Sequence, residues 1–449
     1  MEKLFGTDGI RGMANTYPIT SDMALRTGRA AAVFFKQKGQ DIRIIIGKDP
    51  RISGDMLEYA LASGICSMGG EALLADILPT PGVACLAVSM AASAGIVISA
   101  SHNPFFDNGI KIFKPNGYKL SDREEAAFEK IILSKENDLL CRNVQETGTV
   151  SRIRNSSDRY AGFLKRNFTQ SLSLQGVRIV LDCSNGATSN LAPDLFSDLG
   201  AEVYAIFNHP DGRNINAGCG SQHPDKLAAK VVASKAVAGF AFDGDGDRLI
   251  AVDETGHILT GDQVIAVCAN FLNKKNRLKN NLVVSTIMSN LGLGVALREM
   301  GIAHVKSDVG DRYVLEKMLS CGAVLGGENS GHMIFLDHHT TGDGILAALQ
   351  LLEVIQSESK PLSELARIMH VYPQILINVD VKTKAEIDCI PAIREVIRGV
   401  ENNLGQEGRV LVRYSGTQPI CRVMVEGRDK DETKKYCGRI AAVVKEKLN

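Results

Sequence analysis

A repeated pattern of apolar and polar segments constrains the fold of this chain more than any other sequence feature. RIIIGKDPR (43–51) leads through a helical stretch to EALLADI (71–77), VRIVLDCSNG (177–186) leads to AEVYAIF (201–207), and LVVSTIMSN (282–290) leads to IAHVKSD (302–308). Each copy has the pattern of an apolar strand, a polar turn, an amphipathic helix, a glycine stop and a second strand. Such a βαβ unit requires a largely parallel sheet with helices on its faces. The chain is therefore predicted to contain three similar α/β domains.

Each copy of the pattern is followed by a second shared feature, a short polar loop between two apolar strands. The loops are SASHNPFFDNGIK (99–111), DGDGDR (243–248) and GGENSGH (326–332). Loops that rigid sheets carry to a common place are a usual way to assemble an active site. The sequence thus predicts one site to which several domains contribute.

The C-terminal part of the chain follows a different pattern. QILINVDVKTK (374–384), a helical stretch over 386–399, RVLVRYSGTQPICRVMVEG (409–427) and a helix from about 431 to 447 indicate β-α-β-β-α, a smaller α+β domain. PLSELARIMHVYPQ (361–374) is the predicted linker region before it. The predicted fold is α/β, with four domains around a central cleft, divided as 1–150, 151–255, 256–370 and 371–449.

Composition excludes several classes of partner. The 449 residues include 51 basic and 51 acidic side chains, so the formal net charge is zero and no global field attracts nucleic acid or anionic lipid. No segment reaches the ~18 apolar residues of a membrane span, and the N-terminus lacks the apolar stretch of a signal peptide. The ten cysteines are scattered singly, which favours a reducing compartment. We expect a cytoplasmic protein that binds neither nucleic acid nor membrane, and a homodimer is left open.

DGDGDR places three carboxylates within six residues. If the segment is extended, Asp243, Asp245 and Asp247 point to one side, and their like charges repel unless a cation lies among them. Apolar flanks place the loop at the ends of buried strands, where unpaired carboxylates are costly. Oxygen ligands favour a hard divalent ion, Mg²⁺ first, and a bare solvated turn is the alternative. An EF-hand calcium loop fits poorly, because Arg248 stands where that loop needs glycine.

The other polar loops are ambiguous when each is considered alone. SASHNP suggests a Ser/His nucleophile, but the chain lacks the G-x-S-x-G elbow of serine hydrolases, and a helix cap or an Asn-Pro turn is the alternative. GGENSGH and RYSGTQPICR offer groups that suit a sugar and a phosphate, or they are ordinary hairpin loops. The adjacent His338 and His339 have a poor spacing for a metal and are interpreted as surface or packing residues.

Taken together, FGTDGIRG (5–12), SASHNPFFDNGIK, DGDGDR, GGENSGH and RYSGTQP occur in an order that resembles the α-D-phosphohexomutases over essentially the whole chain. VGDRYVLEKM (309–318), HTTGDGILAALQLL (339–352) and RVMVEG (422–427) resemble the branch that acts on glucosamine phosphates. The resemblance implies an isomerase that interconverts glucosamine 6-phosphate and glucosamine 1-phosphate, a precursor for cell-wall synthesis. It would act through a phosphoserine at Ser101 and a 1,6-bisphosphate intermediate.

The resemblance also implies roles for individual residues. The catalytic residues, among which Lys111 is the preferred acid or base, would be Ser101, Lys111, His102, Arg11, Arg248 and His332. The ligands of Mg²⁺ would be Ser101, Asp243, Asp245 and Asp247. The groups that bind ring hydroxyls, or the phosphate that does not react, would be Glu328, Ser330, Arg413, Ser415, Gly416, Thr417 and Arg422. Judged without the resemblance, Lys111 is equally well a solvated surface lysine.

Two other functions stay open on the sequence. The chain has Gln418 where this branch commonly has glutamate, so a phosphoglucomutase or phosphomannomutase of the same family is one alternative. A non-catalytic, metal-binding regulatory protein with the same fold is the other. Because the C-terminal domain is attached by one linker, we expect it to close over a small sugar-phosphate substrate as a hinged lid.

Overall fold

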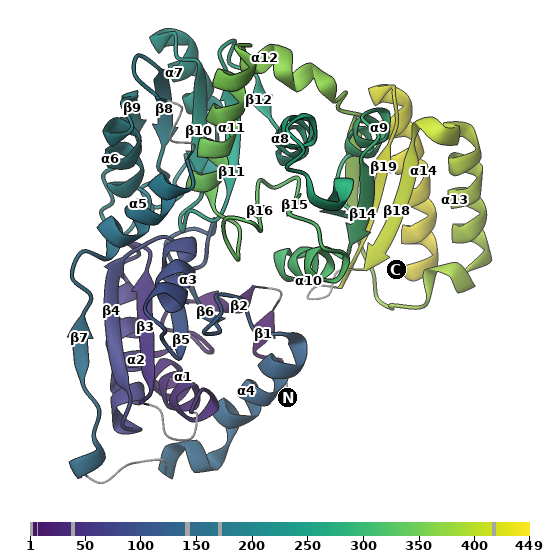
Figure 1. Ribbon diagram of the computed structural model, residues 1–449. Coiled ribbons are helices and arrows are strands. Elements are labelled where there is room, and N and C mark those ends of the chain that lie inside the picture. The colour runs from purple at the N-terminus through teal and green to yellow at the C-terminus, as the bar shows by residue number, and fades with distance from the viewer. Residues whose placement is uncertain (1–2, 7, 37–40, 140–143, 169–172, 415–418) are drawn as a thin grey trace. The chain divides into compact units, whose positions relative to one another are not determined.

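The computed structural model describes residues 3–6, 8–36, 41–139, 144–168, 173–414 and 419–449 (Figure 1). The chain divides into two compact units, one formed by residues 1–288 with 302–368 and the other by residues 289–301 with 369–449. The division follows the change in sequence pattern, because the first unit contains the sheets of the three βαβ repeats and the second contains the C-terminal sheet.

The first repeat forms a seven-stranded mixed sheet with the strand order β1-β2-β6-β5-β3-β4-β7. Strands β3, β4 and β5 are parallel, as the βαβ pattern predicts, and β6 returns antiparallel to β5. Ile44 and Ile46 of β3 share a core with α1 and α2, while α3 covers the opposite face (Figure 1). The bounds are Phe5–Gly6, Gly9–Met13, Arg43–Lys48, Glu71–Ile77, Ala94–Ile98, Asp107–Phe113 and Val150–Arg152 for β1 to β7, and Ser21–Phe34, Gly54–Ser67, Thr80–Ser89 and Asp122–Leu133 for α1 to α4.

The second repeat forms a five-stranded sheet with the order β12-β11-β10-β8-β9. Strands β8, β9 and β10 are parallel, and β11 is antiparallel to β10. The polar loop DGDGDR joins this antiparallel pair, so both of its flanks are strands, as predicted. The bounds are Arg178–Asp182, Glu202–Ile206, Ala238–Phe242, Leu249–Asp253 and Ile258–Leu259 for β8 to β12, and Ser156–Arg166, Leu191–Asp198 and Asp225–Ser234 for α5 to α7.

The third repeat forms a four-stranded sheet with the order β14-β13-β15-β16. Its first three strands are parallel, and β16 is antiparallel to β15, with GGENSGH spanning their junction. All three polar loops therefore occupy the same place in their repeats. The bounds are Leu282–Thr286, Ala303–Ser307, Leu325–Gly327 and Met333–Phe335 for β13 to β16, and Gly261–Lys274, Asp311–Cys321, Gly344–Glu358 and Leu362–Leu365 for α8, α10, α11 and α12.

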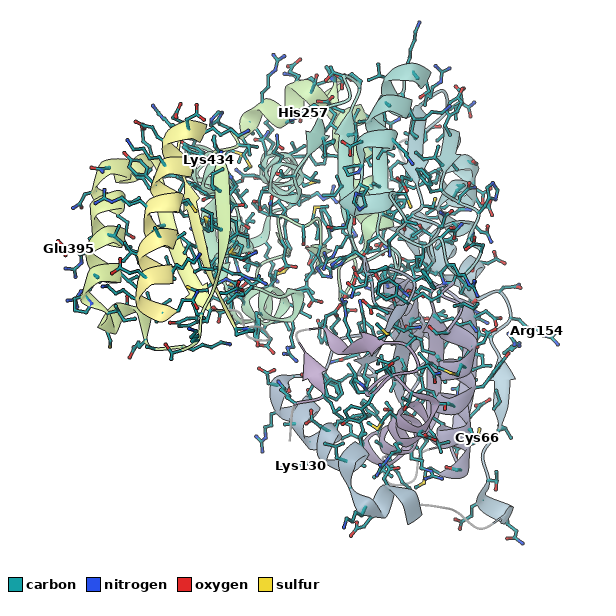
Figure 2. The ribbon with its side chains drawn as sticks, turned by 180° about the vertical axis from the view of Figure 1, so that it is seen from behind. Cys66, Lys130, Arg154, His257, Glu395 and Lys434 are labelled. Atoms are coloured by element: carbon teal, nitrogen blue, oxygen red, sulfur yellow. The ribbon has the colours of Figure 1, made fainter. Side chains whose placement is uncertain are left out.

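The second unit contains an antiparallel sheet, β17 (Gln374–Asp380), β18 (Arg409–Tyr414) and β19 (Ile420–Glu426), in the order β17-β19-β18. Helices α13 (Pro391–Leu404) and α14 (Lys430–Leu448) pack on it, and exposed residues such as Glu395 point away from it (Figure 2). Helix α13 begins five residues after the predicted start, because Pro391 suits the first turn of a helix and not its interior. The unit also includes α9 (Leu291–Glu299).

The observed elements confirm the predicted fold class, three mixed α/β domains and a smaller α+β domain. The predicted order β-α-β-β-α of the C-terminal domain is likewise confirmed. The predicted linker region contains a short helix, α12, so it is not wholly irregular. The three boundaries between the predicted domains stay predictions.

Two general properties of the chain agree with its composition. Within the residues that the structure describes, every helix is too short or too polar to cross a bilayer. The cysteines in that part of the chain are free thiols. Burial raises the pKa of Cys268 to about 12, so its thiol is a packing group and not a nucleophile.

His339 is a packing residue of the first unit, in agreement with one of the two sequence interpretations. Only 4% of it is exposed, and its ring contacts the ring of Phe163 edge-on. Its Nε2 donates to the carbonyl oxygen of Pro81 over 2.9 Å, while its Nδ1 accepts from the backbone N–H of Thr340 over 2.7 Å. Both ring nitrogens are thus satisfied in the neutral form, and burial lowers the pKa of His339 to about 4.

Acidification is expected to destabilise the protein through this histidine. The folded pKa lies below the ordinary value of 6.5, so the stabilisation is complete above pH 6.5 and is lost as the pH falls toward 4. Between pH 7 and pH 5 the loss is about 2 kcal/mol. Denaturant unfolding of wild type and His339→Gln at each pH measures it, because glutamine does not titrate. Equal pH slopes for both proteins would contradict the assignment.

Candidate active site

Ser101 brings the first polar loop into contact with the second. It follows β5 in a left-handed conformation, with a φ of 54°. Its side chain is fully buried, and its Oγ donates a hydrogen bond to Oδ2 of Asp243 over 2.6 Å. Because the two residues lie 142 positions apart in different repeats, this contact supports the predicted convergence of the loops.

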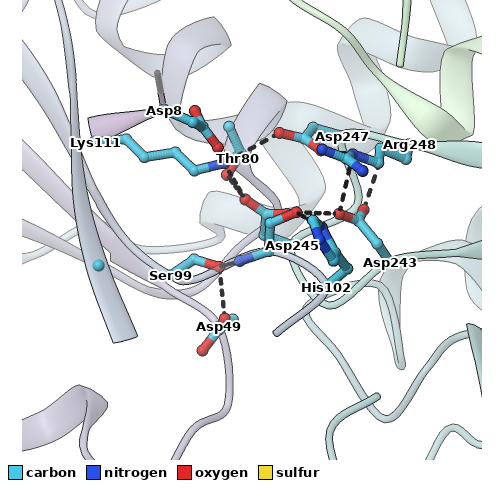
Figure 3. Close-up of polar contacts among 12 residues, drawn as sticks. Asp8, Asp49, Thr80, Ser99, His102, Lys111, Asp243, Asp245, Asp247 and Arg248 are labelled. Carbon is cyan, nitrogen blue, oxygen red and sulfur yellow. Dashed lines mark hydrogen bonds and ion pairs between the residues drawn. The ribbon is translucent and has the colours of Figure 1, made fainter. Parts of the chain in front are cut away.

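The carboxylates of Asp243, Asp245 and Asp247 converge, although their backbone is not extended. Residues 244–246 form a turn in which Gly246 has a φ of 72°, so the extended conformation considered from the sequence is not the one observed. Glycine adopts this left-handed region without the strain that a Cβ brings. The turn still places one oxygen of each carboxylate within 4.8 Å of the others (Figure 3).

The electrostatics of this cluster require a positive charge. All three aspartates are buried, and burial together with the charges of Asp247 and Asp245 raises the pKa of Asp243 well above its usual value. Oδ1 of Asp245 and Oδ1 of Asp247 are buried and accept no hydrogen bond from any residue that the structure describes. Such oxygens are costly unless a cation binds them. The three residues therefore fit a metal ion, whose ligands they can provide.

An EF-hand is excluded by the surroundings of the cluster. Strands and not helices flank the loop, and the acidic residue that would complete such a site, Glu254, points elsewhere. Its carboxylate accepts hydrogen bonds from the backbone N–H of Ser363, over 3.2 Å, and from the Ser363 hydroxyl.

Lys111 lies beside the aspartates and not at the surface. From β6 its Nζ reaches Asp245 Oδ2 at 2.8 Å, Asp8 Oδ2 at 3.0 Å and Asp247 Oδ2 at 3.1 Å (Figure 3). Although burial favours the neutral amine, the charges of Asp245, Asp247 and Asp8 raise the pKa of Lys111 well above its usual value. The ammonium therefore balances part of the negative charge of the cluster.

Three further predicted residues lie around the same cluster. Arg248 Nε is 3.9 Å from both Asp243 Oδ2 and Asp247 Oδ1, and Arg11 forms an ion pair with Asp8. His102 Nδ1 is 3.3 Å from the hydroxyl of Ser101. Burial, followed by the charges of Arg248 and Arg11, lowers the pKa of His102 to about 4, so its ring is neutral at pH 7.

The third loop closes an acidic cavity next to the cluster. The cavity has a volume of about 160 Å³. His332 Nε2 is 3.6 Å from Asp311 Oδ2, and neither ring nitrogen of His332 has a hydrogen-bond partner in the described part of the chain. Glu328 Oε1 accepts from the backbone N–H of Gly310 over 3.1 Å. Ser330 is half-buried in the same loop but does not line the cavity. The side chains that line it, apart from Val309, are Asp8, Asp247, Arg248, Asp311, Glu328 and His332.

The predicted phosphate-binding residues belong to the second unit. Arg413 on β18 lies directly opposite Arg422 on β19, and neither forms an ion pair within the described part of the chain. Burial and the charge of Arg422 lower the pKa of Arg413, and Arg422 Nε is buried without a hydrogen-bond partner among the described residues. Two neighbouring guanidinium groups whose positive charges repel each other suit an anion bound between them. The other predicted members of this group lie outside the described residues: Ser415, Gly416, Thr417 and the variant position Gln418.

The structure adds site residues that the sequence analysis did not identify. Asp8 accepts from Arg11 and from Lys119, whose Nζ also contacts Asp311. Thr80 donates to Asp245 twice, from its backbone N–H over 2.9 Å and from its hydroxyl over 2.5 Å. Asp8 lies within the FGTDGIRG motif, which could have drawn attention to it, whereas no sequence signal marks Thr80.

Comparisons with known proteins agree with this arrangement. The chain matches the four domains described for phosphoglucomutase/phosphomannomutase: the alpha/beta/alpha domain I over residues 2–138, domain II over 158–256, domain III over 260–372 and the C-terminal domain over 376–443. Among solved structures, a phosphoglucomutase/phosphomannomutase family protein from Burkholderia thailandensis has a TM-score of 0.81 at 24% identity, with 100% of this chain and 98% of that chain covered.

Other known proteins share a much larger fraction of identical residues with this chain. The chain is 59% identical to the phosphoglucosamine mutase of Syntrophus aciditrophicus over 448 residues, which cover 100% of both proteins. It is 56% identical to the phosphoglucosamine mutase of Syntrophobacter fumaroxidans over 445 residues, which cover 99% of both. With four matching domains in family order and an acidic cluster facing a buried serine, the chain belongs to the phosphoglucomutase/phosphomannomutase family of α-D-phosphohexomutases.

Proposed function

We propose that the chain is a phosphoglucosamine mutase, which interconverts glucosamine 6-phosphate and glucosamine 1-phosphate. The observation that carries the proposal is the hydroxyl of Ser101, held 2.6 Å from a carboxylate of the buried aspartate cluster. The identity of 51–59% with proteins named phosphoglucosamine mutase over their full length supports the choice of sugar. The phosphoryl group of Ser101 would pass to O1 of the substrate, and the phosphate on O6 of the resulting bisphosphate would return to Ser101.

The aspartate cluster is proposed to hold Mg²⁺, with Ser101 contributing an oxygen. Carboxylate oxygens and a small polar cluster suit this hard ion. When bound, Mg²⁺ supplies positive charge at the phosphoryl group. The chain adds charge of its own, because Arg248 and Lys111 both lie beside the cluster.

Proton transfer is assigned to Lys111, with His102 and His332 as the other candidates. The sugar hydroxyl that attacks the phosphoryl group must lose a proton, and the departing oxygen must gain one. Lys111 contacts Asp8 as well as the cluster, and Asp8 in turn contacts Arg11. We therefore assign Arg11 to the lining of the reaction site and do not count it among the groups that transfer a proton.

Binding in two orientations needs contacts that serve either end of the sugar. Glu328 and Ser330 are assigned to ring hydroxyls. The phosphate that does not react is assigned to the second unit, where Arg413 and Arg422 lie opposite each other on neighbouring strands and suit an anion. Those phosphate-binding residues are Arg413, Ser415, Gly416, Thr417 and Arg422.

The acidic cavity favours an amino sugar over a neutral hexose. The side chains of Asp311 and Glu328 line it. Their carboxylates would attract the positive charge of a 2-ammonium group, whereas a neutral 2-hydroxyl group would gain no such attraction. A coupled assay is expected to give a kcat/KM for glucosamine 6-phosphate at least about 100-fold above that for glucose 6-phosphate. A preference for glucose 6-phosphate, or for mannose 6-phosphate, would assign the chain to another branch of the family.

The regulatory alternative makes a different prediction for the same protein. A non-catalytic chain would carry no phosphoryl group, so its intact mass would equal the mass calculated from the sequence. The proposed enzyme should instead show a fraction about 80 Da heavier, the mass that a phosphoryl group adds.

A further inference from the structure

The backbone of the Ser101 loop is held by a single arginine of the first repeat. Arg51, which is 2% exposed, donates from Nη2 to the carbonyl oxygens of Ser101 and Asn103, over 2.9 and 2.8 Å. Its Nη1 donates to the carbonyl oxygens of Pro104 and Asp107, the latter over 3.1 Å. The guanidinium thus binds four main-chain carbonyls of one loop, which an ammonium group cannot do with its single nitrogen.

The second repeat holds two of the same carbonyls. Asn216 lies on the chain between β9 and α7, and its Nδ2 donates to the carbonyl oxygens of Ser101 and Asn103, both over 2.9 Å. Its own backbone N–H donates to the carbonyl oxygen of Ser184 over 2.9 Å, which fixes it to the loop after β8. The carbonyl of Ser101 therefore accepts one hydrogen bond from each repeat.

The amide of Ser101 is fixed as well. Its N–H donates to Ser99 Oγ over 2.8 Å, and Ser99 Oγ donates to Asp49 Oδ2 over 2.6 Å (Figure 3). Asp49 in turn accepts from Arg51 Nε over 2.9 Å. Both main-chain groups of Ser101 are thus bound by side chains, at a residue whose φ of 54° is strained for any residue with a Cβ. Such a conformation persists only where the surroundings determine it.

We propose that Arg51 and Asn216 are positioning residues that form a carbonyl clamp on the Ser101 loop. The inference rests on the proposed function, since the clamp matters for catalysis only if Ser101 carries the transferred group. In-line transfer is sensitive to displacements of about 1 Å. Asn216 belongs to the second repeat, which also provides the three aspartates. The clamp therefore fixes the position of Ser101 relative to the aspartate cluster.

The sharpest test replaces Asn216 with glycine. Asn216 has a φ of 57°, which glycine adopts without strain, so Asn216→Gly removes the amide and leaves the backbone favourable. Asn276→Gly is the matched control, because Asn276 is exposed, has a φ of 55° and lies away from the site. Wild type and both variants are compared by kcat, by KM and by hydrogen–deuterium exchange of the peptide spanning residues 99–108.

The clamp predicts that Asn216→Gly lowers kcat by about 10- to 100-fold, with KM changed less than threefold. Exchange in the 99–108 peptide should rise about tenfold, since two hydrogen bonds are lost. Arg51→Lys should lower kcat further. If that variant does not fold, Asn216→Gly alone decides.

Unchanged exchange in the 99–108 peptide overturns the clamp whatever the activity. Faster exchange with an unchanged kcat overturns the positioning role, and a rise in KM at constant kcat assigns Asn216 to substrate binding instead. A wild-type protein without mutase activity would refute the proposed function, while exchange would still decide whether the clamp exists.

Discussion

Replacement of Ser101 with alanine is expected to stop turnover almost completely. The hydroxyl is the proposed carrier of the phosphoryl group, and loss of a covalent nucleophile lowers kcat by on the order of 10⁴-fold or more. The folded structure should survive. The change removes the hydrogen bond to Asp243 and the 3.3 Å contact with His102 Nδ1, and costs about 1 to 2 kcal/mol. The coupled assay measures the activity, and thermal unfolding measures the stability.

Intact-mass analysis separates this prediction from a general loss of fold. Wild type should carry a phosphoryl group that Ser101→Ala lacks. Ser320→Ala is the matched control, because Ser320 is exposed on α10 and its hydroxyl donates to the carbonyl of Lys317 within the same helix. A phosphoryl group that persists in Ser101→Ala would place the covalent intermediate on another residue.

The parts of the site that could be predicted are those that contiguous loops carry. Ser101, the three aspartates and His332 each lie in a loop at the same place of a repeat, and runs of Gly, Asp, Asn and Ser between apolar strands identify such loops. The prediction that the three aspartates need a cation also did not depend on the conformation that was assumed for them. Their side chains converge through a turn at Gly246 and not along an extended strand, yet like charges require a cation in either case.

The parts that could not be predicted are contacts between distant segments. Thr80 reaches Asp245 across 165 residues, and Asn216 reaches Ser101 across 115 residues. Neither Thr80 nor Asn216 interrupts a periodic pattern, because each donates a hydrogen bond from an otherwise ordinary turn or helix start. Such pairs follow from the packing of one repeat against another, which local propensity does not encode. The supporting residues of the site therefore required the structure, whereas its proposed reacting groups could be named from the sequence.

Replacement of Asp245 with asparagine is expected to weaken metal binding severely with little effect on the fold. Asparagine has nearly the same shape, and its oxygen can still accept the hydrogen bond from the Thr80 hydroxyl. The change breaks the ion pair between Asp245 and Lys111, but it also removes the repulsion between Asp245 and Asp243, which contributes to the raised pKa of Asp243. The two effects on the free energy of unfolding therefore oppose each other. Replacing a residue that only hydrogen-bonds to a metal ligand usually weakens metal binding about 10- to 100-fold. Because Asp245 is a proposed ligand itself, its replacement should lower the activity at limiting Mg²⁺ at least about 100-fold.

Thermal unfolding with and without Mg²⁺ tests the metal site without an activity assay. An ion present at about 100 times its Kd stabilises a folded protein by about 2.7 kcal/mol, so Mg²⁺ should raise the Tm of wild type. The increase should persist in Asp431→Asn, which changes an exposed aspartate in the first turn of α14, and should vanish in Asp245→Asn. An Asp245→Asn protein that keeps both the Tm increase and full activity at low Mg²⁺ would show that the metal binds elsewhere. If only the activity is lost, Asp245 acts on the transferring group and not on the affinity for the ion.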